Sequence, residues 1–154
     1  MTFDASLDAV FVCLADPDFL VERAMAVGDL EASYDVEEDD EVVTVTAQRT
    51  TETDLPGFLA KMFSPEQEIT VTETWQGDSD RMEGSYEMEI HGQPASVSAS
   101  ITLIADGDER CTYTISHKAT VKLPLIGGKA AKFLQGETEK VALAELEYIA
   151  GQLA

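Results

Sequence analysis

The feature that most constrains this chain is a run of six strand-like segments followed by one long helical segment. Most of the six alternate apolar and polar residues, and all are rich in residues that favour β-structure. Short polar connectors such as residues 78–80 and 106–108 separate most of them, which favours an antiparallel meander. The strand segments are residues 29–38, 41–53, 67–77, 81–92, 94–105 and 109–123, and the helical segment is 126–154.

The N-terminal part adds a short strand and two helices before this run. Residues 2–7 predict the strand, and residues 8–16 and 17–28 predict two short helices, the second with Pro17 in its first turn. The longer connector at 54–66 predicts a helical turn. The chain has 154 residues and no linker or repeat, so we expect one domain over residues 1–154. A chain of this length buries roughly two-thirds of its unfolded surface.

Charge and apolar runs exclude several classes of partner. With 30 acidic and 10 basic residues the net charge is −20, so nucleic acid and anionic membranes are expected to be poor partners. This charge also fits a salty cytoplasm or a need for solubility. No basic segment precedes an apolar run at the N-terminus, and no apolar run reaches membrane-spanning length, so we expect a cytoplasmic protein without stable membrane insertion. Cys13 and Cys111 form no CxxC motif and are expected to be reduced thiols.

The order of elements, a strand, two helices, six strands and a long helix, is that of the helix-grip fold, an α+β fold. Three motifs are more specific: LPGFLAKMF at 55–63, ETW at 73–75 and VKLPLIGGKAAKF at 121–133. With them the chain resembles an actinobacterial family of unknown function within the START and polyketide-cyclase-like (SRPBCC) superfamily. The resemblance implies a seven-stranded antiparallel sheet wrapped around the C-terminal helix, with a cavity for lipids, sterols, polyketides or other apolar molecules. It carries over no catalytic residue.

Strand alternation predicts which side chains face the helix. At the start of the second strand it places Leu30 inward and Asp29 outward. On the last helix, Leu134, Val141 and Tyr148 are expected on the buried side. The inner positions expected to contact a ligand are Tyr34, Arg49, Glu73, Trp75, Gly84, Tyr86, Met88, Ala99, Tyr113 and His117.

Arg49 and Glu73 are the two charged residues among these inner positions. If the third and fourth strands pair around residue 61, the two side chains lie directly opposite each other and form a buried ion pair. The same register places Gly84 at this level, where the missing side chain would leave space. Such a pair either orients the strands or contacts a ligand, and the sequence leaves both readings open.

Three functions fit this pattern. The first is binding or carriage of a small apolar molecule that enters near residues 55–66 and the start of the last helix. The second is a cyclase or dehydratase with Glu73 or His117 as general acid or base, which requires that group to be unpaired. The third is a partner-binding module with a filled core. We expect no cofactor and no metal site, since His117 is inward and His91 outward. Gly127 and Gly128 are expected to allow close approach of helix and sheet rather than to bind phosphate.

Overall fold

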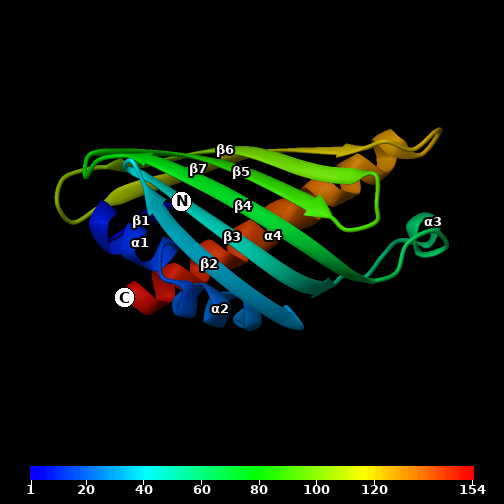
Figure 1. Ribbon diagram of the computed structural model, residues 1–154, viewed down its shortest axis with the longest axis horizontal. Helices are drawn as coiled ribbons and strands as arrows, with labels where there is room; N and C mark the ends of the chain where they lie inside the picture. The colour runs from blue at the N-terminus through cyan, green and yellow to red at the C-terminus, as the bar shows by residue number, and fades with distance from the viewer.

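The computed structural model describes residues 1–154 and contains one seven-stranded antiparallel sheet that curves around a long helix (Figure 1). The strand order is β1-β7-β6-β5-β4-β3-β2, so the N-terminal strand pairs with the last one and the rest form a meander. This confirms the predicted helix-grip fold. The strands are β1 (Thr2–Phe3), β2 (Glu31–Asp39), β3 (Val42–Glu52), β4 (Glu66–Gly77), β5 (Arg81–Ile90), β6 (Ala95–Ala105) and β7 (Cys111–Val121).

Four helices accompany the sheet: α1 (Leu7–Leu14), α2 (Pro17–Ala26), the single turn α3 (Gly57–Ala60) and the long α4 (Gly127–Leu153). The first strand is shorter than the predicted 2–7, because the Ser6 side chain accepts the N–H of Ala9 and starts α1. Asp16 caps α2 in the same way, one residue before Pro17. None of the helices combines the length and the apolar character needed to cross a bilayer.

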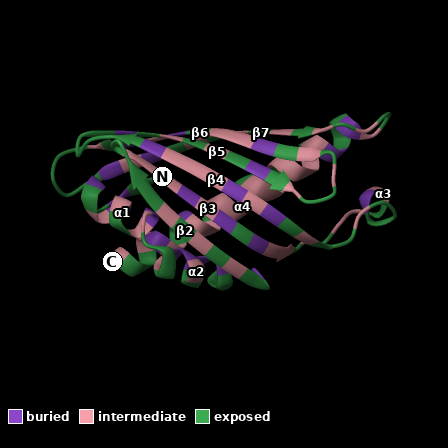
Figure 2. Ribbon diagram, viewed as in Figure 1, coloured by how far each residue is buried: buried purple, intermediate pink, exposed green.

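The core lies between the concave face of the sheet and the helices. Figure 2 shows buried and exposed positions alternating along the strands, as the pattern predicts. Trp75 is fully buried at the centre of the larger cluster, where the Phe11 ring packs edge-on against it with ring centroids 5.8 Å apart. A smaller cluster around Val71 and Val97 lies further along the sheet. Both cysteines are free thiols, Cys111 being buried and Cys13 partly so.

Two predicted orientations change at the ends of elements. Leu30 was expected inward but is 44 % exposed, whereas Asp29 was expected outward and is 8 % exposed. The alternation fails there because β2 begins only at Glu31, and the two preceding residues belong to the turn after α2. On α4, Leu134, Val141 and Tyr148 are all partly buried, so none faces solvent and the predicted helix face is correct.

Gly127 and Gly128, which open α4, have different surroundings. A Cβ at Gly127 would lie 2.7 Å from the carbonyl oxygen of Val121, whereas a Cβ at Gly128 would meet nothing within 4 Å. Only Gly127 is therefore needed for the close approach of α4 to β7.

We predict that Gly127→Ala destabilises the fold by about 1 to 3 kcal/mol, because the methyl group must displace backbone. Gly128→Ala, the matched control, should be neutral or stabilising by up to about 1 kcal/mol, since alanine favours a helix. Urea unfolding followed by circular dichroism measures both. Equal destabilisation of the two variants would contradict the proposed role of Gly127.

Candidate functional site

The predicted opposition of Arg49 and Glu73 is wrong. In the structure Arg49 pairs with Ile69 and Glu73 pairs with Val45 across the same two strands. Pairing of Glu52 with Glu66 centres the connection on residue 59 rather than 61. Leu59, which is buried, anchors this connection at its middle. The shift moves the partner of Glu73 by four residues, and the alternation of faces stays unchanged.

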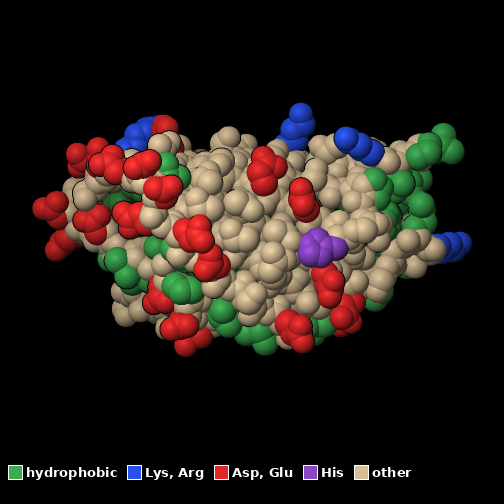
Figure 3. Space-filling view, in the orientation of Figure 1, with side chains coloured by type: hydrophobic (Ala, Val, Ile, Leu, Met, Phe, Trp, Pro, Cys, Tyr) green, Lys and Arg blue, Asp and Glu red, His purple; other side chains and the backbone are tan.

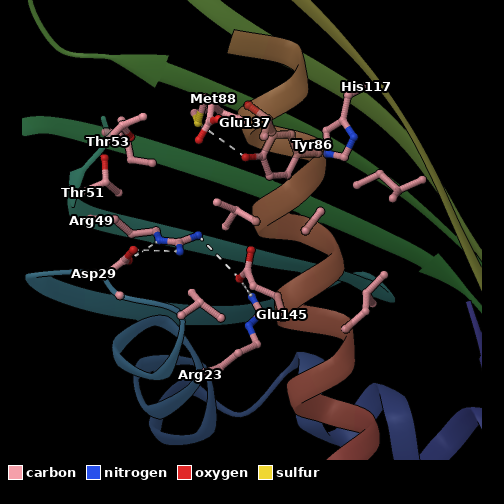
Figure 4. A pocket seen from close by; sticks show the side chains of 18 of the residues that line it. Arg23, Asp29, Arg49, Thr51, Thr53, Tyr86, Met88, His117, Glu137 and Glu145 are labelled. Atoms are coloured by element: carbon pink, nitrogen blue, oxygen red, sulfur yellow. Dashed lines mark hydrogen bonds and ion pairs between the residues drawn. The ribbon is translucent and has the colours of Figure 1, made fainter. Parts of the chain in front are cut away.

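The buried partner of Arg49 is Asp29, the last but one residue before β2. Arg49 Nε donates to Asp29 Oδ2 at 2.6 Å and Arg49 Nη2 donates to Oδ1 at 3.2 Å, a bidentate arrangement. Arg49 Nη1 also lies 3.6 Å from Glu145 Oε2 on α4. Figure 4 shows Arg23 of α2 approaching the same carboxylate, with Nη2 2.8 Å from Oε2. These four side chains form what we call the ion cluster.

The ion cluster is buried, and its hydrogen bonds are incomplete. Arg23 Nε lies away from solvent without a hydrogen-bond partner, and Glu145 Oε2 has ion-pair contacts whose angles are not those of a hydrogen bond. Burial raises the pKa of the Asp29 carboxyl, while its hydrogen bonds from Arg49 oppose the rise. A further buried donor is therefore available at this point of the structure.

Glu73 lies near the ion cluster but has no basic side chain within 4.0 Å. Its Oε2 accepts a hydrogen bond from Trp75 Nε1 at 3.2 Å. Burial raises the pKa of the Glu73 carboxyl, and the positive charge of Arg23 opposes this only in part. Glu73 is thus an inward carboxyl without a close counterion, and its hydrogen-bond partner is the indole N–H of Trp75.

The ion cluster and Glu73 form one end of a cavity of about 150 Å³ between the sheet and α4. Its walls include apolar side chains from β4, β5, β7 and α4, among them Ile69, Ile115 and Val141. An adjoining space of about 20 Å³ beside Tyr34 could hold one water molecule. Of the residues predicted from sequence to contact a ligand, six line the larger cavity: Arg49, Glu73, Tyr86, Met88, Tyr113 and His117.

Four predicted ligand contacts do not line the larger cavity: Tyr34 borders only the adjoining space, and Trp75, Gly84 and Ala99 border neither. Trp75 is enclosed in the core, and its ring occupies the place of the side chain that Gly84 lacks, since a Cβ at Gly84 would lie only 3.0 Å from the indole. Gly84 therefore makes room for Trp75 rather than for a ligand, contrary to the prediction. Ala99 lies between Tyr86 and His117 in the strand register and also stays outside the cavity lining.

His117 and Tyr86 form the opposite wall. Their rings meet edge-on with centroids 5.9 Å apart, and the Tyr86 hydroxyl donates to Met88 Sδ at 3.5 Å. Burial lowers the pKa of His117, with the charge of Glu139 opposing, so the imidazole is mainly neutral at pH 7. No group of three or more His, Cys, Asp or Glu side chains is arranged to hold a metal ion.

Sequence reasoning missed three members of the site: Arg23, Asp29 and Glu145. Glu145 follows Val141 by one helical turn, so the predicted inner face of α4 could have identified it. Arg23 lies between the buried Leu20 and Ala24 of α2, a weaker signal. For Asp29 the sequence carries no signal, because strand alternation points it outward.

A second, apolar groove of about 100 Å³ continues from the cavity toward α3. The two spaces share the lining residues Thr53, Leu134 and Glu137. The groove runs between the α3 connection, where Leu55 and Phe63 contribute, and the start of α4. Cavity and groove together provide a charged inner end and an apolar outer end.

Comparison with known proteins identifies a family and a fold. The family model described as "Protein of unknown function (DUF2505)" matches residues 1–152. No curated protein matches the chain. Among solved structures, a conserved protein from Geobacillus kaustophilus is similar with a TM-score of 0.58 and 15% sequence identity, over 99% of this chain and 90% of that chain. At this identity the similarity concerns the fold alone.

We predict that Arg49→Met destabilises the protein by about 3 to 5 kcal/mol, because it leaves the buried Asp29 carboxylate uncompensated. Combining it with Asp29→Leu should recover much of this loss. The double-mutant cycle, measured by denaturant unfolding, should give a coupling of roughly 0.5 to 3 kcal/mol. The matched cycle of Arg49→Met with Glu73→Gln should give a smaller coupling energy. A larger coupling energy for Arg49 with Glu73 than for Arg49 with Asp29 would instead support the pairing predicted from sequence.

Glu73→Gln should stabilise the protein at pH 7 to 8, because glutamine keeps an acceptor for Trp75 Nε1 without a buried charge. A raised pKa means that Glu73 favours folding below its unfolded pKa of about 4.3 and loses this contribution as pH rises through the folded value. The gain from the substitution should therefore shrink toward pH 4. Thermal unfolding of both proteins across this pH range measures the difference in their stability. A stability gain that does not vary with pH would show that the pKa of Glu73 is not raised.

Proposed function

We propose that this chain, which belongs to the DUF2505 family of proteins of unknown function, binds and carries a small apolar molecule in the cavity between sheet and α4. The helix-grip fold supports its placement in the START and polyketide-cyclase-like superfamily. The observation that carries the proposal is the cavity itself. Well-packed interiors have few voids larger than a water molecule, and an apolar cavity of about 150 Å³ in another protein accommodates benzene.

The charges at the inner end favour a ligand with one neutral polar group. Arg23 and Arg49 are balanced by Asp29 and Glu145, which leaves Glu73 as the additional acid. Burial raises the pKa of Glu73 and so favours its uncharged form, so neither a ligand carboxylate nor a ligand ammonium would meet an unpaired opposite charge. A hydroxyl group can donate to Glu73 and accept from the free Arg23 Nε, so it suits both.

Acid or base catalysis is the second candidate, and the state of Glu73 favours it. A general acid must be free of a salt bridge and have a pKa above that of an ordinary carboxyl; Glu73 forms no salt bridge, and burial raises the pKa of its carboxyl. The two functions share one ligand site. If the retained ligand is converted to a product, Glu73→Gln should abolish turnover while ligand binding persists. The third candidate, a partner-binding module without a small ligand, is favoured by a filled core, and the cavity supports it least.

We predict that Ala142→Phe abolishes or weakens saturable binding of an environment-sensitive apolar dye, because Ala142 lines the cavity and the ring would fill it. The expected loss is at least about tenfold. Leu143→Phe is the matched control, since Leu143 is 51 % exposed on the same helix and lies outside the cavity lining. Helical circular dichroism checks that both variants fold.

The same dye can rank ligand classes by competition. A straight-chain alcohol should displace it at lower concentration than the acid or amine of equal chain length. Native mass spectrometry of protein purified from its own host would then identify a retained molecule. Wild-type protein that binds no dye saturably, or equal binding by the Ala142→Phe and wild-type proteins, would contradict a ligand in this cavity.

A further inference from the structure

The two ends of the molecule differ in charge. In a meander, alternate connections lie at opposite ends of the sheet, and here one end receives the three acidic turns at residues 37–41, 78–80 and 106–109. The other end receives the α3 connection at 53–65, the β5–β6 connection at 91–94 and the β7–α4 connection at 122–126. We call residues 55–65 and 121–133 at this end the basic tip. The basic tip includes four exposed lysines, Lys61, Lys122, Lys129 and Lys132, and no Asp or Glu, although the exposed Asp54 and Glu66 flank its first segment. Figure 3 shows acidic side chains most densely grouped at one end, with others along the face, and apolar and basic side chains at the opposite tip.

The basic tip also exposes aliphatic side chains. Leu125 is fully exposed, and its φ of 68° places it in the left-handed region, where a residue with a Cβ is strained. Met62 on the other segment is 53 % exposed. The Lys129 ammonium lies 4.2 Å from the centre of the Phe58 ring and links the two segments. The tip thus presents apolar groups between positive charges, with no intramolecular contact that accounts for the exposed Leu125.

We infer that the basic tip docks on the surface of an anionic lipid bilayer. Lysines near such a surface are attracted by its negative potential, and exposed aliphatic side chains can enter the headgroup region. The acidic turns oppose binding of the molecule as a whole, but they lie at the far end of the strands. Charges beyond the Debye length of about 8 Å at physiological salt are largely screened, so the nearby lysines dominate at contact.

Two features favour a bilayer over a nucleic acid. The apolar groove opens between the two segments of the basic tip, so a docked protein would place the groove next to lipid. The exposed apolar side chains are aliphatic, whereas binding of single-stranded nucleic acid depends on exposed aromatic rings. The inference does not depend on the ligand proposal, because docking requires only the surface of the tip.

Co-sedimentation with vesicles tests the inference. Wild-type protein should sediment with vesicles of phosphatidylcholine mixed with phosphatidylglycerol, and a smaller fraction should sediment with phosphatidylcholine alone. The fraction that sediments with the anionic vesicles should fall as the salt concentration is raised. Lys122→Gln and Lys132→Gln should each weaken binding about fivefold, and the double variant about 25-fold. Leu125→Ser should also weaken it. Lys140→Gln is the matched control, because Lys140 is an exposed lysine of the same helix outside the tip.

Three results would overturn the inference. One is absence of sedimentation with the anionic vesicles, and another is equal loss in the Lys140→Gln control. The third is salt-sensitive binding to single-stranded DNA or RNA that exceeds binding to the vesicles. None of the substituted residues lines the cavity, so all of the variants should still bind the dye. Dye binding therefore separates a failure to dock from a failure to fold.

Discussion

The buried contact between Arg49 and its two carboxylates is the interaction on which the geometry of the candidate site depends. Arg49 comes from β3, Asp29 from the turn before β2, and Glu145 from α4, with Arg23 of α2 completing the cluster. Charges removed from water are tolerated only when they are paired, so each member constrains where the others can lie. The ion cluster therefore joins the sheet, α2 and α4 at one point.

This joint also explains why a cavity persists beside it. Side chains that must meet partners of opposite charge cannot move freely to fill the neighbouring volume, whereas the apolar clusters on either side pack closely. Trp75 illustrates the contrast: Gly84 makes room for its ring, and Glu73 holds its N–H. The result is a space with apolar walls and a charged inner end, on which the proposal of a small apolar ligand with one polar group rests.

The meander also separates charge along the strand direction. Because successive connections alternate between the two ends, the acidic turns gather at one end and the lysine-rich connections, with Asp54 as their one acidic residue, lie at the other. The net charge of −20 therefore describes the whole molecule poorly. A surface can be repelled by most of the protein and still attract the end where the apolar groove opens.

The sequence by itself determined the order of the elements, which is that of the helix-grip fold. It determined the inner faces of the strands and the buried face of α4 as well, because these follow from periods of two and 3.6 residues. It also identified Arg49 and Glu73 as inward charges, and six of the predicted ligand contacts line the cavity. Only the tertiary structure decided what those charges meet. A shift of four residues between β3 and β4 leaves every side chain on the same face, so alternation cannot detect it. The partners of Arg49 come from a turn and from a helix distant in the chain. The neutralisation of a buried charge depends on distance in space, and the periodicity of a single segment does not predict which distant residues meet.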